Sequence, residues 1–457
     1  MLSEFVHDKA RDLGLPGAAA GVWADGREDF ACDGVTSLDN PLPVDRHTLF
    51  EVGSVSKTFT ATALMCLVSQ GKAELGAPVR RYVPELRLAD EQAAAQITVA
   101  QLLNHTAGLG WALLADTGAG DDALAVYAAR LGELKPVGPP GARASYSQAG
   151  YNLAGRVIEK VTGLTFEEAV ASLLLRPLGL RESFYLDGEV MTRRFAVGHN
   201  PADDGKLAVA VDWRRWRCNN PGGGLVSSVS DQLRWARFHL GDGGAGGADR
   251  ILPAEVLRQM KEPTVELRGT TLGDALGICW FLRDVGGVRT VGHGGSGHGQ
   301  FAELLLVPER DFAIVSVANA GPDGIPFNQA VVRWALEHYL GVTDADPQPL
   351  PYDRARALEY AGTYENDAIR LVVAAGDGGM TLSAGIKPEI RAASGTEMPP
   401  DYPPMAIGLL PGDGDEYILI EGGMKGQRGF FTRDGAGDIV GLDLAGRIAS
   451  RVGPDPS

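Results

Sequence analysis

The sequence predicts a mixed α/β fold of the α+β kind. Helices flank one antiparallel sheet, a helical lobe is inserted against it, and a small all-β, barrel-like module follows. Three observations lead to this prediction: β-rich runs near both ends of residues 1–340, helical and loop-rich sequence between them, and short β runs with Gly and Asp turns after residue 352. A chain of 457 residues also exceeds the usual size of one domain, so we expect two.

The predicted sheet is assembled from segments that are far apart in the chain. After a short amphipathic helix, residues 17–35 predict two strands joined at the hairpin signal Asp25-Gly26. Residues 300–320 predict two more strands, and residues 326–341 have helical spacing. We therefore expect the two strand pairs to meet in one sheet, with the middle of the chain forming the helical lobe.

A change of composition predicts the domain boundary. The stretch GVTDADPQPLPYDRARAL is rich in Pro and Asp, as linkers are. We place a first domain at residues 1–345, a linker at 346–351 and an all-β domain at 352–457. That module could fold alone, hold a ligand in a barrel, or wall one side of a cleft in the first domain. We expect the third role, because the boundary follows a helix that packs on the sheet.

Composition limits the possible partners. The net charge of −16 and the lack of any Lys/Arg run argue against nucleic acid or an anionic membrane, so we expect a small-molecule or peptide substrate; the oligomeric state stays open. The four cysteines form no C-x-x-C pair, and we expect neither a metal nor a cofactor. The N-terminus lacks an apolar h-region, which predicts a cytoplasmic protein or one that has lost its leader.

Two copies of Ser-x-x-Lys lie close together, at Ser54 and Lys57 and at Ser69 and Lys72. Ser54 precedes a long apolar run, so we expect it to open a helix, where free N–H groups and the positive dipole end favour an oxyanion. Residues i and i+3 share a helix face, which brings the amine of Lys57 to the hydroxyl. The alternative for Ser54 is an ordinary N-cap serine. Ser69 lies just before the helix stop at Gly71, so we expect the second copy to be inert.

Two further polar segments could complete a site. Tyr146 to Gln148 form a polar turn just before a predicted helix, and His293 to Ser296 lie at a predicted strand edge. Glycines in the second segment let another backbone approach closely and leave N–H groups pointing outward.

Six segments in this order resemble the serine β-lactamase and penicillin-binding-protein-like family, the branch with class C β-lactamases, D-aminopeptidases, family VIII esterases and transacylases. They are LFEVGSVSKTFTA, LLNHTAGLG, YSQAGYNLAG, PLGL, PGGGLVSSVSD and GHGG. The resemblance covers residues 1–345, and the stretch from YAGTY to ASRV resembles the lipocalin-like domain of some members. No G-x-S-x-G occurs, which argues against an α/β-hydrolase elbow.

The resemblance implies a role for each candidate residue. Ser54 is the nucleophile, Lys57 is its base with a pKa lowered by desolvation, and Tyr146 shuttles a proton between Ser54, Lys57 and the leaving group. The backbone N–H groups of Ser54 and Ser296 form the oxyanion hole. The remaining residues are expected to bind substrate: Gln148, His293, Gly294 and Gly295.

Two departures from the family pattern bear on the substrate. Gln148 stands where the family usually has Asn. Its side chain is one methylene longer than that of Asn, and it keeps both amide functions for hydrogen bonds to a substrate. His293 replaces the Lys of β-lactamases and Gly294 replaces their hydroxyl residue, and those groups bind the carboxylate of a β-lactam. A neutral His293 could serve as a hydrogen-bond donor. The pattern is more similar to the esterase, D-peptidase and transacylase members.

The sequence therefore predicts a serine hydrolase or acyltransferase that forms an acyl-enzyme at Ser54 with an ester or a D-residue amide or peptide. Three alternatives stay open: a transacylase or peptide cyclase that passes the acyl group to an amine or alcohol, a β-lactamase, and a sensor or binding protein that is acylated without turnover.

Overall fold

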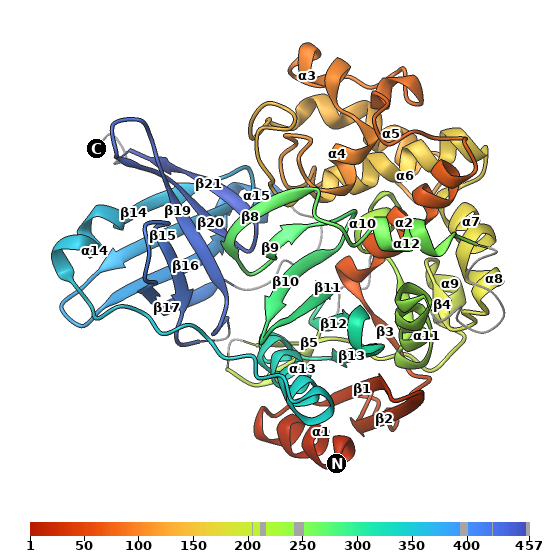
Figure 1. Cartoon of the computed structure of the whole chain (residues 1–457), viewed down its shortest axis with the longest axis horizontal. Helices are drawn as coiled ribbons and strands as arrows, with labels where there is room; N and C mark the ends of the chain where they lie inside the picture. The colour runs from red at the N-terminus through yellow and green to blue at the C-terminus, as the bar shows by residue number, and fades with distance from the viewer. Residues whose placement is uncertain (203, 211–215, 242–250, 394–400, 423, 454–457) are drawn as a thin grey trace.

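An antiparallel sheet of eight strands forms the centre of the first domain (Figure 1). The computed structural model describes residues 1–202, 204–210, 216–241, 251–393, 401–422 and 424–453. The strands are, in spatial order, β2 (Arg27–Gly34), β1 (Gly17–Ala24), β13 (Phe312–Ala318), β12 (Gln300–Val307), β11 (Val288–Gly297), β10 (Phe281–Val285), β9 (Gly273–Leu276) and β8 (Val265–Thr270).

The two ends of the domain meet in this sheet, as the sequence predicts. β1 pairs with β13 in the register Ala20↔Ser316, and β13 pairs with β12. Both β1 and β13 are buried on both faces, which explains why their sequences are almost entirely apolar, with Ser316 as the polar exception, rather than alternating. The α+β fold prediction is confirmed.

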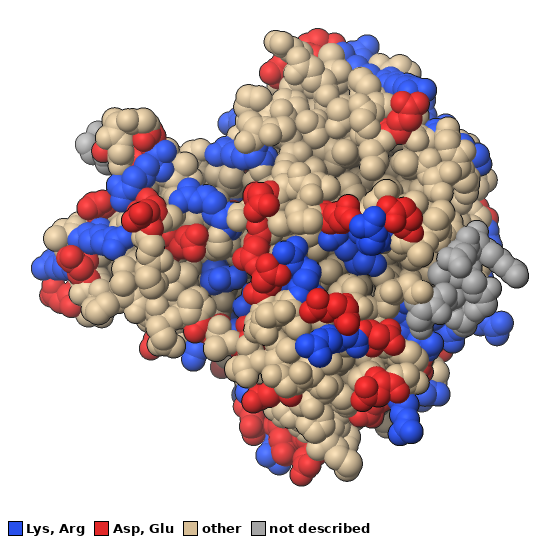
Figure 2. Space-filling model, viewed as in Figure 1, with Lys and Arg blue, Asp and Glu red and all other residues tan. Residues whose placement is uncertain are grey.

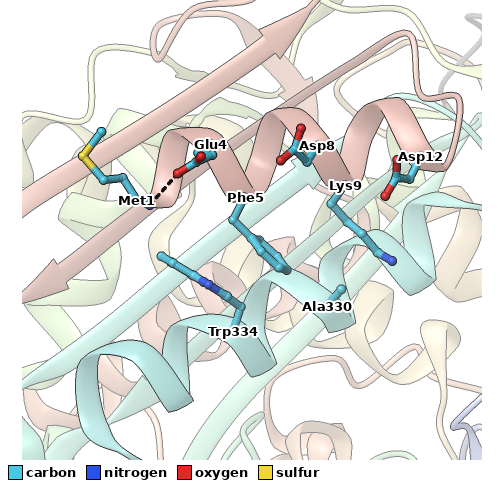
Figure 3. Close-up of a pocket in the computed structure, with 8 residues that line it drawn as sticks. All are labelled: Met1, Glu4, Phe5, Asp8, Lys9, Asp12, Ala330 and Trp334. Carbon is cyan, nitrogen blue, oxygen red and sulfur yellow. Dashed lines mark hydrogen bonds and ion pairs between the residues drawn. The ribbon is translucent and has the colours of Figure 1, made fainter.

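Two helices cover one face of the sheet. They are α1 (Leu2–Asp12) and α13 (Gly324–Leu340), which share an apolar core with the strands beneath. Figure 3 shows Phe5 of α1 lying over Trp334 of α13, with ring centroids 5.1 Å apart. A hollow between these helices is lined mainly by side chains of α1, including Asp8 and Asp12, and by none of the predicted site residues.

The opposite face carries α2 (Ser56–Ser69), α11 (Val229–Leu240) and the helical lobe. The lobe and its surroundings contain α3 (Glu91–Gln96), α4 (Val99–Leu103), α5 (Ala123–Arg130), α6 (Gln148–Thr162), α7 (Phe166–Val170), α8 (Arg176–Leu178), α9 (Asp187–Val190), α10 (Asn220–Gly223) and α12 (Ala254–Gln259). Short strands form two small separate sheets: β3 (Leu49–Glu51), β7 (Val226–Ser228) and β4 (Ser183–Phe184) in one, and β5 (His199–Pro201) and β6 (Leu207–Val209) in the other.

The C-terminal region forms a closed barrel of eight strands (blue in Figure 1). Its elements are α14 (Arg354–Tyr360), β14 (Gly362–Glu365), β15 (Ile369–Ala375), β16 (Met380–Ile386), α15 (Pro388–Ala393), β17 (Tyr402–Leu409), β18 (Glu416–Leu419), β19 (Arg428–Arg433), β20 (Ile439–Leu444) and β21 (Arg447–Val452). Side chains such as Tyr364, Tyr417 and Phe431 fill the interior. A filled barrel of this size favours a packed core over a ligand cavity.

The surface mixes both signs of charge. In the face shown in Figure 2, acidic and basic side chains are interspersed over the barrel and the main body. Among the described residues, no helix has the length and apolar character needed to cross a membrane.

Candidate active site

The nucleophile turn lies between a short strand and a buried helix. Ser54 is the middle residue of a 3₁₀ turn, Gly53–Val55, which continues directly into α2. The residue that precedes α2 is Val55, and no side chain caps the helix, so the N-cap alternative for Ser54 is wrong. At the other end of α2, Ser69 is exposed, as predicted for the second Ser-x-x-Lys copy.

Two glycines allow strand β11 to lie directly against this turn. Gly53 has a φ of +48°, and a Cβ on it would stand 2.5 Å from the backbone N of Ser296. A Cβ on Gly295 would stand 2.0 Å from the carbonyl O of Val52 and 2.7 Å from the N of Ser54. Any larger residue at these positions would separate the two backbones. The glycines therefore let the backbone of Ser296 lie close to the turn that contains Ser54.

Lys57 extends from the first turn of α2 and is completely buried. Its Nζ lies 3.0 Å from Oγ of Ser54, 2.5 Å from Oε1 of Gln148 and 2.6 Å from the carbonyl O of Gly222. Burial lowers the pKa of Lys57 well below the usual value for lysine. A neutral amine is therefore favoured.

The three neighbours of Nζ fix the direction of its lone pair. The oxygens of Gln148 and Gly222 can only accept hydrogen bonds, so the neutral amine donates its two N–H groups to them. The remaining position faces Ser54, whose hydroxyl can donate. The lone pair of Lys57 is thus directed at the hydroxyl group of Ser54.

Tyr146 lies above this pair and is almost fully buried. Its ring is 4.9 Å from Nζ of Lys57 and 4.4 Å from the ring of His105. Burial raises the pKa of Tyr146, while a hydrogen bond with Ser54 and the charge of Arg447 act in the opposite direction. The phenol is therefore protonated near neutral pH, so it can donate a proton but cannot act as the resting base.

The amide of Gln148, the first residue of α6, is engaged within the protein. Oε1 accepts from Lys57, and Nε2 donates to Oδ1 of Asn219 at 2.7 Å and, more weakly, to Oδ1 of Asn152 at 3.4 Å. The sequence predicts that this amide binds substrate. In the structure these contacts hold Lys57, and Gln148 is not among the residues that line the cavity described below; its role toward substrate stays a prediction.

His293 does not reach the cavity. Only 1% of its surface is exposed, its ring stacks on Phe281 at 4.4 Å, and Nδ1 lies 2.7 Å from the carbonyl O of Gly294. Burial, with the nearby Lys57, lowers the pKa of His293 to about 3, so the ring is neutral. The neutral tautomer that carries its proton on Nδ1 donates to this carbonyl of its own strand, and a role of His293 in substrate binding stays a prediction.

A cavity of about 320 Å³ opens above the nucleophile, lined on this side by Ser54, Tyr146 and the segment from Gly294 to Ser296. The structure thus brings together the predicted nucleophile, base, proton shuttle and oxyanion strand. No group of three or more potential metal ligands occurs among the residues that the structure describes.

Arg447 is a site residue that the sequence reasoning missed. It lies at the turn between β20 and β21, and its guanidinium is 5.0 Å from the ring of Tyr146 and 5.2 Å from that of Trp111. The backbone N of Tyr146 also donates to the carbonyl O of Gly446 at 2.8 Å. The barrel therefore contacts Tyr146, which lies beside Ser54. The sequence around Arg447, LAGR, contains no motif that would predict this contact.

The fold is that of serine β-lactamases and penicillin-binding proteins. A family model described as Beta-lactamase matches residues 2–336, and the chain belongs to that family. Penicillin-binding protein 4 of Amycolatopsis lactamdurans is 33% identical over 362 residues, covering 77% of this chain and 94% of that protein. The predicted resemblance is confirmed.

Other relatives share part or all of the chain. The esterase EstB of Burkholderia gladioli is 34% identical over 218 residues, which cover 44% of this chain and 54% of the esterase. The crystal structure of SurE covers 99% of this chain and 98% of its own, with a TM-score of 0.76 and 27% identity. A class C β-lactamase from Rhodobacter sphaeroides, 20% identical with a TM-score of 0.60, covers 73% of this chain and 99% of its own and shares the fold.

Proposed function

We propose that the chain is a serine hydrolase or acyltransferase that forms an acyl-enzyme at Ser54 with an ester or a D-residue amide or peptide. The observation that carries this proposal is the buried amine of Lys57, 3.0 Å from Oγ of Ser54, with its other two neighbours restricted to accepting hydrogen bonds. A serine hydroxyl needs such a base, because it is a weak nucleophile at neutral pH.

The acylation step follows from these positions. Lys57 takes the proton of Ser54 as Oγ attacks the carbonyl carbon, and the oxyanion that forms is held by the N–H groups of Ser54 and Ser296. The bond to the leaving group then breaks while Tyr146 donates its proton to it. The phenolate of Tyr146 recovers a proton from protonated Lys57, and the same base activates the water, alcohol or amine that releases the acyl group.

The relatives support the substrate class. An esterase is among them, and SurE has also been solved with D-Leu, in a structure 27% identical to this chain with a TM-score of 0.75. The β-lactam alternative has less support, because His293 is neutral and buried where a β-lactamase presents a lysine. The transacylase or peptide cyclase alternative differs only in the acceptor of the acyl group.

One assay separates the candidates. The products of p-nitrophenyl ester turnover are measured with and without an added amine. With the amine present, a hydrolase still gives only the carboxylic acid, whereas an acyltransferase gives the amide. A single burst of nitrophenolate without further turnover identifies an acylated sensor, and hydrolysis of a chromogenic cephalosporin identifies a β-lactamase. For a hydrolase or an acyltransferase, we expect intact-mass measurements to detect the acyl group on Ser54. Absence of the acyl group with all of these substrates would refute the proposal.

A further inference from the structure

The active-site cavity continues past the nucleophile to the other face of the sheet. β10 pairs with β11 only as far as Gly292, so the edge of β11 is not covered by β10 from His293 onward. The cavity passes this edge and is lined beyond it by Glu303 of β12, Asn328 of α13 and Arg428 of the barrel. Three parts of the protein therefore enclose a second chamber beside the oxyanion strand.

Most charges in this chamber are already paired. Arg283 binds Asp344 at 2.6 Å, and Arg333 binds Asp346. Within the described part of the chain, Glu303 makes no hydrogen bond or ion pair through its carboxyl group. Arg428 and Arg447, on the barrel side, likewise form no ion pair with described residues. The chamber thus contains one unpaired carboxyl group on the sheet side and two guanidinium groups without an ion pair on the barrel side.

The carboxyl group of Glu303 stands directly over Gly294. The two residues are cross-strand partners, and a Cβ on Gly294 would lie 2.7 Å from Oε2 of Glu303. Neighbouring residues of a strand point to opposite faces, and Gly295 faces the N of Ser54. Glu303 is therefore close to the oxyanion strand but on the face away from Lys57, so a group bound by Glu303 is not the reacting nitrogen.

We propose that Glu303 binds a non-reacting primary ammonium group on the acyl donor, and that the chamber selects substrates with a free amine at a distance from the scissile bond. This inference rests on the proposed acyl-enzyme at Ser54 and specifies its substrate. Glu303 is partly exposed to the cavity, and a partly buried carboxylate without a partner is stabilised by a ligand cation.

The ionisation of Glu303 fits this role. Burial raises the pKa of Glu303 to about 7, and no neighbouring cation lowers it. The ionised form is present above pH 7 and is lost as the pH falls, so selection for an ammonium group should strengthen with rising pH until the amine itself loses its proton near its usual pKa of about 10. Ser316 and Asn328 lie behind Glu303, and the charged groups lining the cavity are Arg283, Arg333, Asp344, Asp346, Arg428 and Arg447.

Matched esters test the proposal. The kcat/KM values of p-nitrophenyl ω-amino esters of increasing length are compared with those of n-alkanoyl esters of equal length. At the best length we expect the wild type to prefer the ammonium ester at least about tenfold, with the preference falling below pH 7. Glu303→Gln should remove the preference while leaving the neutral esters within about twofold. Glu309→Gln, at an exposed carboxyl group in the turn after β12, should change neither.

Two readouts keep this test separate from that of the proposed function. Labelling of Ser54 by a small fluorophosphonate reports an intact site in each variant. The amide of the ω-amino acid with the best chain length can be titrated into the protein by calorimetry, which needs no turnover. Its binding should persist in Ser54→Ala but disappear in Glu303→Gln. Equal kcat/KM for both ester series in the wild type, or an ammonium preference that survives Glu303→Gln, would overturn the assignment even if Ser54 is acylated normally.

Discussion

The Nζ atom of Lys57 lies 3.0 Å from Oγ of Ser54, and the other two atoms within hydrogen-bond distance of it are oxygens that can only accept. One buried amine is thus aligned on one hydroxyl by groups from α6 and α10. This relationship leads to the first three predictions below.

Replacing the nucleophile should abolish chemistry. We expect Ser54→Ala to lose both ester turnover and labelling by a fluorophosphonate, because no other hydroxyl among the described residues has this contact with Lys57. Ser69→Ala is the matched control, since it removes the exposed serine of the second Ser-x-x-Lys copy and should leave both signals intact. Undiminished activity in Ser54→Ala would disprove the mechanism.

Removing the base should slow acylation about a thousandfold, equivalent to about 4 kcal/mol in the barrier. Burial lowers the pKa of Lys57, so in the wild type acylation should decline as the pH falls through that lowered value and the amine gains a proton. Stopped-flow acylation rates across the pH range check this. This decline at low pH, the acid limb of the pH profile, should be absent in Lys57→Ala. An unchanged acid limb in the variant would mean that another group causes the decline.

A negative charge at position 148 should move the acid limb of the pH profile of acylation. In Gln148→Glu a carboxylate replaces the amide oxygen that accepts from Lys57, and an adjacent negative charge favours the ammonium form. We expect the acid limb to shift to higher pH and acylation at pH 7 to fall about tenfold or more. Gln148→Asn serves as the uncharged comparison, since it lengthens the contact without adding charge. An identical pH profile in the wild type and Gln148→Glu would contradict the contact.

The close approach of β11 to the nucleophile turn can be tested at Gly295. A Cβ there would lie 2.0 Å from the carbonyl O of Val52, so Gly295→Ala should push the strand away and displace the oxyanion donors. Losing one such donor lowers kcat by about two to three powers of ten. Gly76→Ala is the control, because its Cβ would meet open space. Normal kcat in Gly295→Ala would exclude the N–H of Ser296 from the oxyanion hole.

The barrel should contribute to chemistry through Arg447. Its positive charge lowers the pKa of Tyr146 and so stabilises the phenolate that forms when the phenol donates its proton. We expect Arg447→Ala to reduce kcat for amide or alkyl-ester substrates, whose leaving groups need that proton, about tenfold. Turnover of p-nitrophenyl esters should change less, since nitrophenolate leaves without it. Arg354→Ala, an exposed barrel arginine, should behave as the wild type. Equal losses with both leaving groups would argue against a role through Tyr146.

The sequence by itself determined the local features. The β-rich runs at the two ends of the first domain, the Ser-x-x-Lys segment at the start of a helix, and the glycines around Gly295 are properties of short stretches, because periodicity and turn chemistry act over a few residues. These features predicted the sheet, the Ser54 and Lys57 pair, and the strand that approaches them. They also separated Ser54 from the exposed Ser69.

Only the tertiary structure decided the contacts between distant segments. The contact of Gln148 with Lys57 depends on Asn219 and Gly222, more than seventy residues away from Gln148, and the burial of the His293 ring depends on the ring of Phe281. The position of Arg447 depends on how the barrel docks against Tyr146. Burial and charge proximity set pKa values, and both arise from packing between elements rather than from spacing along the chain.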